Sequence, residues 1–176
     1  MSNDTQTQAV RESVAGDRET VFRELSELVS FNSVHGDPEL TDQTAAAADW
    51  VAEAFTAAGL DVDKLETTDG SLAVVGRRAA KGDAPTVLLY CHYDVVAAGA
   101  REAWETDPFT LTERDGRWYG RGSADCKGNV AMHLAALRAV EAAGGTDLGL
   151  ILVAEGSEEQ GGAGLDDLVA QRPELT

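Results

Sequence analysis

The sequence predicts an α/β fold in which helices cover a layered sheet. Three observations lead to this prediction. Segments whose apolar residues recur at helical spacing alternate along the chain with short apolar runs typical of buried strands. Glycine, proline and Asp-Gly signals separate these segments. The chain has 176 residues, of which 43% are hydrophobic, and this suits a single domain with its own core.

Four segments are predicted to be helical. Residues 17–30 carry apolar side chains at helical spacing. Residues 41–58 follow a loop rich in Asn, Ser, Gly and Pro, and Gly59 is the expected stop signal. Residues 127–143 repeat the helical spacing, and residues 165–169 are expected to open a last helix.

The predicted strands are residues 72–75, 86–91 and 148–154. The second and third of these are continuous apolar runs, which is the pattern of strands buried on both faces. A short hairpin is expected from residues 109–112 and 117–119, because Asp115-Gly116 between them is a hairpin turn signal.

The composition argues against several classes of protein. Asp and Glu total 31 against 14 Lys and Arg, a formal net charge of −17. A nucleic-acid binder needs a basic patch for phosphate contacts, so this balance argues against one. No apolar run approaches the roughly twenty residues of a membrane span. The polar opening at residues 1–8 lacks the basic and apolar regions of a signal peptide.

Cysteine and lysine usage favour a cytoplasmic protein. Two cysteines are too few for a disulfide scaffold, so a reducing cytoplasm is the simplest location. Lysine occurs only at Lys64, Lys81 and Lys127, while acidic residues are abundant. A strongly acidic surface stays hydrated in concentrated salt, where charges are screened over short distances. We therefore expect a salt-loving cytoplasm, with an ordinary acidic protein as the alternative.

The first of three polar clusters, His92-Tyr93-Asp94, directly follows the predicted strand 86–91. On an extended backbone His92 and Asp94 point to the same side. A neutral imidazole can bind a metal, and a carboxylate behind it can fix its tautomer. In open α/β sheets ligands collect at the carboxyl ends of strands, where this pair is predicted to lie. The alternative is a solvated loop with a chance His-x-Asp.

The second cluster, residues 120–128, is glycine-rich and opens the predicted helix 127–143. Its Asp125 lies near a helix N-terminus, where a carboxylate is stabilised in its ionised form. Such a carboxylate could bridge two metal ions, and the alternative is a simple helix cap.

The third cluster, residues 155–162, follows the predicted strand 148–154 and contains adjacent glutamates. Glu158 and Glu159 are expected to point in different directions, so one can ligate a metal while the other reaches the neighbouring water. A glutamate in that place suits a general base. The alternative is a solvated acidic loop. The ordered combination of all three clusters is less frequent by chance than any one of them.

The clusters belong to a longer set of motifs between Leu88 and Gly162. The set comprises Leu-Leu-Tyr-Cys-His-Tyr-Asp-Val-Val at 88–96, Trp104, Asp107-Pro108-Phe109, Asp115-Gly116, Tyr119-Gly120-Arg121-Gly122, Asp125, Lys127-Gly128 and Glu155-Gly156-Ser157-Glu158-Glu159. It resembles the zinc aminopeptidase-like hydrolases. Within them it resembles the group of acetylornithine deacetylase, succinyl-diaminopimelate desuccinylase, glutamate carboxypeptidase, carnosinase-type dipeptidases and aminoacylase.

The resemblance implies a role for each site residue. His92 would ligate one of two zinc ions, Asp125 would bridge both, and Glu159 would ligate the other. Asp94 would orient His92, and Glu158 would be the general base on the bridging water. Cobalt or manganese could replace zinc. The implied fold is a mixed, mostly parallel sheet with helices on both faces.

The implied activity is metal-dependent hydrolysis of amide bonds in small N-acyl amino acids or short peptides. The family's fold also has a lid domain, a further acidic ligand and a late histidine ligand, whereas no histidine follows Glu159 here. Residues 1–176 are therefore interpreted as the N-terminal part of the catalytic domain, without the lid and the C-terminal part, and a homodimer is expected only of a full-length form. Two alternatives stay open: a truncated, non-catalytic relative that binds metal weakly or needs a partner segment, and an acidic binding module.

Some positions depart from the family's pattern without touching a proposed ligand. The family usually has Pro, Met and Gly where this chain has Ala97, Cys126 and Cys91, and it favours Gly-Ser where this chain has Gly161-Gly162. Both cysteines are interpreted as buried small residues, in preference to thiolate ligands or a redox switch. His35 and His133 are expected to be structural or exposed.

Overall fold

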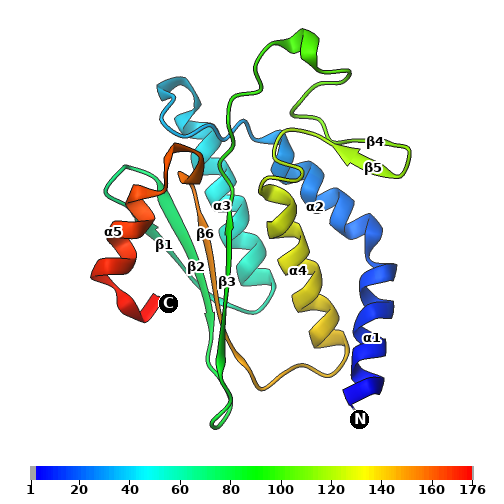
Figure 1. The fold of residues 1–176 in the computed structure, drawn as a ribbon. Coiled ribbons are helices and arrows are strands. Elements are labelled where there is room, and N and C mark those ends of the chain that lie inside the picture. Colours follow the sequence, from blue (N-terminus) through cyan, green and yellow to red (C-terminus); the bar gives the residue numbers. More distant parts are fainter. Residues whose placement is uncertain (1–2, 176) are drawn as a thin grey trace.

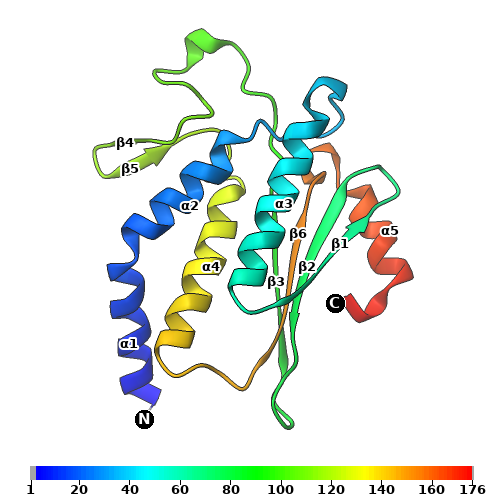
Figure 2. The ribbon, with the colours of Figure 1, turned by 180° about the vertical axis from the view of Figure 1, so that it is seen from behind.

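The computed structural model describes residues 3–175, and Met1, Ser2 and Thr176 lie outside the described residues. A four-stranded sheet is covered by helices on both faces (Figures 1 and 2). The helices are α1 (Asn3–Gly16), α2 (Arg18–Ser30), α3 (Thr41–Ala57), α4 (Lys127–Ala142) and α5 (Ala163–Gln171). The strands are β1 (Asp61–Glu66), β2 (Leu72–Arg78), β3 (Thr86–His92), β4 (Thr112–Arg114), β5 (Arg117–Tyr119) and β6 (Gly149–Glu155). Among the described helices none is long and apolar enough to cross a membrane.

The sheet has the strand order β1-β2-β6-β3. Strands β3 and β6 are parallel, with His92 opposite Glu155 at their carboxyl ends. The β1–β2 and β2–β6 pairs are antiparallel. The expectation of a mixed sheet is confirmed, but its mostly parallel character is wrong for the described strands. In the β1–β2 pair, the short turn between the strands can connect only antiparallel neighbours. Strand β3 reaches β6 through the α4 crossover, which is long enough for a parallel pair.

The core lies in two layers, which confirms helices on both faces of the sheet. The larger cluster packs α3 and α4 against one face and includes the fully buried Val51, Phe55 and Leu152. A smaller cluster packs α5 and the segment after it against the other face, where Leu175 covers Val75 and Val153. The β4–β5 hairpin packs on α2, where the Phe22 and Trp118 ring centroids are 5.2 Å apart.

Most predicted elements are present, with boundaries shifted by a few residues. Two elements were not predicted, helix α1 and strand β1, because both are polar and only half-buried along one narrow face. The prediction that residues 86–91 are buried on both faces is wrong in the described structure. Strand β3 is at the sheet edge, and Leu88 and Tyr90 are 44% and 45% exposed. Strand β6, in contrast, is buried along most of its length as expected.

Candidate metal centre

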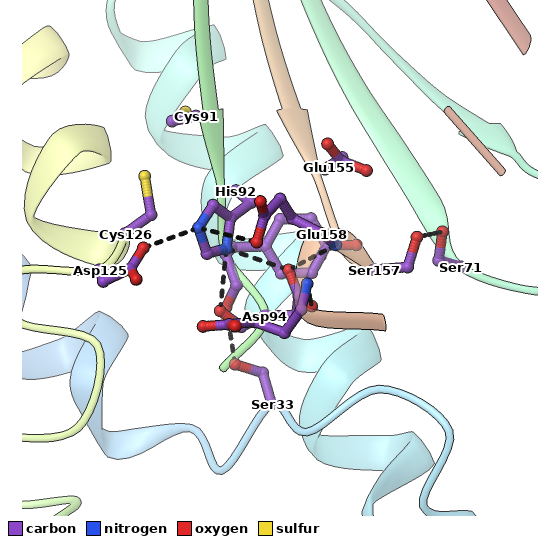
Figure 3. Close-up of polar contacts among 12 residues, drawn as sticks. Ser33, Ser71, Cys91, His92, Asp94, Asp125, Cys126, Glu155, Ser157 and Glu158 are labelled. Carbon is purple, nitrogen blue, oxygen red and sulfur yellow. Dashed lines mark hydrogen bonds and ion pairs between the residues drawn. The ribbon is translucent and has the colours of Figure 1, made fainter. Parts of the chain in front are cut away.

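The predicted site residues meet at the carboxyl ends of two parallel strands. His92 is the last residue of β3, and it pairs with Glu155, the last residue of β6. The chain beyond β3 carries Asp94, and the chain beyond β6 forms a short 3-10 turn, Glu158–Gln160. Asp125 stands just before α4 and approaches His92 from the side (Figure 3). Residues 92, 125 and 158 are thus close in space although they are far apart in sequence.

The imidazole of His92 is the centre of the cluster. Its Nε2 is 3.0 Å from Asp125 Oδ1 and 3.7 Å from Glu158 Oε2. His92, Glu158 and Glu159 each offer a potential ligand atom, and these three atoms all lie within 4.8 Å of one another. The His92 ring is buried, whereas the Asp125 side chain is 80% exposed. The structure therefore brings the five predicted site residues into one cluster with an open side, and their roles stay predictions.

Asp94 is fully buried and holds three parts of the cluster together. Its Oδ1 is 3.2 Å from His92 Nδ1 and accepts a 3.2 Å hydrogen bond from the Glu158 amide. Its Oδ2 accepts a 3.1 Å hydrogen bond from the Glu159 amide. In the neutral form of His92, a proton on Nδ1 would leave Nε2 free to bind a cation, and Nε2 is the nitrogen that faces Asp125. The sequence predicted the contact to His92 but not the two backbone contacts.

The electrostatics of the cluster suit a divalent cation. Burial lowers the pKa of His92, but hydrogen bonds and charge at Asp94 and Cys126 outweigh it and raise that pKa to about 11. Burial and the nearby Asp125 carboxylate raise the pKa of Glu159. Several carboxylates thus face one imidazole, and a bound cation would offset the repulsion between these carboxylates. An imidazole nitrogen with carboxylate oxygens is a donor set that zinc accepts, so the residues fit a metal ion.

The two cysteines are buried as expected, at 0% exposure for Cys91 and 5% for Cys126. Cys126 lies closer to the site than the sequence indicated, because its Sγ is within 4.8 Å of potential ligand atoms of His92 and Asp125. The Asn129 side-chain amide donates a 3.0 Å hydrogen bond to this sulfur. Burial raises the pKa of the Cys126 thiol, but hydrogen bonds and charge at His92 together with Asn129 lower it overall.

Two buried residues that support the site have no role in the sequence-based interpretation. Lys127 Nζ donates a 2.6 Å hydrogen bond to the Phe31 carbonyl. Burial lowers the pKa of Lys127 to about 7, although the negative charge of Asp94 acts to raise it. Ser33 Oγ donates a 2.7 Å hydrogen bond to the Tyr93 carbonyl. These two hydrogen bonds hold the loop after α2 against the end of strand β3, where His92 lies. Lys127 was visible only as part of a motif, and nothing in the sequence marked Ser33.

Helices on both faces of a mixed sheet, with an imidazole and carboxylates at parallel strand ends, define the class of a metallopeptidase-like α/β domain. A profile of the peptidase family M20/M25/M40 matches residues 88–175. The chain belongs to this peptidase family.

Similar proteins agree with this assignment. The cysteinylglycine-S-conjugate dipeptidase of Corynebacterium striatum is 52% identical over 176 residues, which cover 99% of this chain and 39% of that protein. The Cys-Gly metallodipeptidase dug1 of Schizosaccharomyces pombe is 35% identical over 85% of this chain and 34% of its own length. The structure of human carnosine dipeptidase 1 covers 93% of this chain with a TM-score of 0.86 at 26% identity, and 37% of that chain is matched. The chain thus spans between about one third and two fifths of the length of these relatives.

Proposed function

We propose that the full-length protein containing residues 1–176 is a metal-dependent dipeptidase, which hydrolyses the peptide bond of small dipeptides. The observation that carries this proposal is the convergence of His92, Asp125 and the Glu158–Glu159 pair at the ends of β3 and β6. An imidazole alone or an acidic loop alone would not favour it. The combination gives ligands for a cation and a free carboxylate beside them.

Each residue has a separate part in this chemistry. His92 and Asp125 would hold one cation, and Asp125 with Glu159 would hold the second. A bound divalent cation supplies the positive charge that acidifies water and polarises the substrate carbonyl. Glu158, whose side chain is 46% exposed, takes the proton from the attacking water and passes it to the leaving amine. Asp94 faces His92 Nδ1, so that Nε2 would be the nitrogen offered to a cation, and it holds the two glutamates by their backbone amides.

We propose two zinc ions as the cofactor, with cobalt or manganese as replacements. Catalytic zinc normally has three protein ligands and water. The described residues offer two proposed ligands to each ion. We therefore propose that residues 1–176 are the N-terminal part of the catalytic domain, that the remaining ligands and a lid lie elsewhere in the full-length protein, and that a homodimer requires the full-length form.

The relatives suggest which dipeptides to test. One relative is named for S-conjugates of cysteinylglycine and another for Cys-Gly. We therefore propose a dipeptide whose first residue is cysteine, with or without a substituent on sulfur, and whose second residue is glycine. The desuccinylase of Stenotrophomonas maltophilia, 38% identical over 128 residues, supports including N-acyl amino acids as the competing substrate class.

The experiment compares the full-length protein with a Glu158→Gln variant. Both are loaded with zinc, stripped with a chelator and reloaded, and assayed against Cys-Gly, an S-substituted Cys-Gly, carnosine and N-succinyl-diaminopimelate. We expect hydrolysis of the Cys-Gly dipeptides by the loaded parent, none after stripping, and a large loss in the variant. Preferred cleavage of the N-succinyl compound would assign the deacylase class instead. Activity that survives complete metal removal would refute the metal-dependent proposal.

A further inference from the structure

The turn between β1 and β2 lies against the loop that carries Glu158 and Glu159. Asp69 in this turn uses both carboxylate oxygens. Its Oδ1 accepts hydrogen bonds from Thr67 Oγ1 at 2.7 Å and the Ser71 amide at 3.0 Å, which shape the turn itself. Its Oδ2 accepts from Ser157 Oγ at 2.8 Å, in the loop after β6, and from the Gly164 amide at 3.1 Å, in the first turn of α5. One side chain therefore connects two segments that are almost ninety positions apart in sequence.

Ser157 is the residue through which this contact reaches the site. It is fully buried and precedes Glu158 directly. Its carbonyl accepts hydrogen bonds from the Gln160 amide at 3.0 Å and the Gly162 amide at 3.1 Å. It therefore fixes the short turn Glu158–Gln160, here called the glutamate turn, on both sides. Its hydroxyl lies 3.2 Å from Ser71 Oγ as well (Figure 3). A shift of Ser157 would move the backbone of the glutamates.

We propose that Asp69 is a positioning residue, which holds Glu158 and Glu159 in place through Ser157. This inference rests on the proposed function, because it assigns Asp69 to the same metal-dependent site. Asp94 binds the Glu158 and Glu159 amides from the β3 side. Asp69 binds the preceding residue from the β1–β2 side. The glutamate turn is thus held by two carboxylates at three consecutive residues.

Two further observations support this assignment. A Cβ built on Gly164 would lie 2.5 Å from Asp69 Cγ, so the first turn of α5 is packed as closely on this carboxylate as glycine allows. Burial raises the pKa of Asp69, but the hydrogen bonds from Thr67, Ser71 and Ser157 outweigh it and hold that pKa well below its usual value. Asp69 is therefore ionised at neutral pH and makes charge-assisted hydrogen bonds, which are stronger than neutral ones.

The matched control is Asp167. Its Oδ2 accepts a 2.7 Å hydrogen bond from Thr68 Oγ1, so it also joins the β1–β2 turn to α5. Among the described residues it makes no hydrogen bond to Ser157 or to the glutamate turn. Asp69→Asn and Asp167→Asn make the same chemical change in neighbouring contacts. Only the first weakens the support of Ser157, because it removes the charge and one of the two acceptor oxygens at that contact.

The experiment measures zinc affinity in the full-length protein by competition with a chelator. We expect Asp69→Asn to weaken binding about 10- to 100-fold, as for other residues behind metal ligands, and Asp167→Asn to change it less than about twofold. In a Glu159→Gln background the Asp69 change should have little further effect, because the ligand that it positions is already missing. A general loss of stability would weaken binding equally in both backgrounds. If Asp69→Asn fails to fold, Ser157→Ala, which removes only one of the four contacts, should show a smaller effect in the same direction.

The possible results separate this inference from the proposed function. If both Asp69→Asn and Ser157→Ala keep the zinc affinity of the parent while His92→Ala abolishes zinc binding, the inference is overturned and the proposed function stands. An equal effect of Asp69→Asn with and without Glu159 would also overturn it. A parent protein that binds no zinc would refute the proposed function and the inference together.

Discussion

Replacement of Asp94 by Asn tests whether one buried carboxylate organises the site. Asp94 is fully buried and accepts hydrogen bonds from the amides of Glu158 and Glu159 while facing His92 Nδ1. Asn has nearly the same shape, but it lacks the charge and has only one acceptor oxygen. Its NH₂ group would face an amide donor, so at least one backbone amide loses its partner.

The size of the effect follows from these contacts. A hydrogen bond to a charged group contributes about 1.5–3 kcal/mol, and a buried donor left without a partner costs about 1–3 kcal/mol. One lost bond and one weakened bond give a loss of about 2–4 kcal/mol in the free energy of unfolding. With a urea m-value of about 2 kcal/mol/M, the unfolding midpoint should fall by about 1–2 M. Zinc affinity should fall about 10- to 100-fold, because His92 loses the group that orients it.

Urea unfolding followed by tryptophan fluorescence, with chelator competition for zinc, measures both effects. Asp83→Asn is the control, because Asp83 is an exposed residue in the turn between β2 and β3. We expect this variant to match the parent in both measurements. A midpoint for Asp94→Asn equal to that of Asp83→Asn, together with parental zinc affinity, would refute the reasoning.

Three further predictions follow from the structure. Glu158→Gln in the full-length protein should retain zinc but lose about 10²–10⁴-fold in kcat, as expected for the loss of a general base. The zinc content and kcat are measured in parallel, and near-normal turnover would assign the role of general base to another group. Gly128→Ala should lower the free energy of unfolding by about 1–3 kcal/mol, because its Cβ would lie 2.2 Å from the Ser123 carbonyl oxygen. Gly16→Ala is the control, because a Cβ there meets no atom within 4 Å. Equal urea midpoints for the two variants would contradict this prediction. Asp69 stabilises the fold only when ionised, and its folded-state pKa is lowered from 3.8. The difference in free energy of unfolding between the parent and Asp69→Asn should therefore be full above about pH 4 and become smaller as the pH falls below it. Urea titrations from pH 7 to pH 3 measure this difference. A difference that grows in acid would contradict the predicted direction of the pH dependence.

Local patterns predicted the elements that position the site. The apolar run of residues 148–154 became the buried strand β6, and the helical spacing of residues 127–143 became α4. The exposure of Leu88 and Tyr90 was not predictable, because an apolar run has the same appearance whether its strand is central or at an edge. Strand β1, Asp61–Glu66, has no such run and forms by pairing with β2.

The ligand candidates were predictable, whereas the residues that hold them were not. His92, Asp125 and Glu159 are chemically conspicuous and follow strands or precede a helix. Asp69 had the appearance of an ordinary turn residue beside Gly70, because its partner Ser157 comes from a distant segment. Contacts of this kind depend on how β2 pairs with β6, which the sequence pattern does not encode locally.

Anomalous X-ray diffraction at the zinc edge, from crystals of the zinc-loaded full-length protein, tests the central claim most directly. We expect a strong peak at coordination distance, about 2.0–2.2 Å, from His92 Nε2 and an Asp125 carboxylate oxygen, and a second peak shared by Asp125 and Glu159. Peaks only at other positions, with His92 Nε2 bonded to protein or water alone, would contradict it.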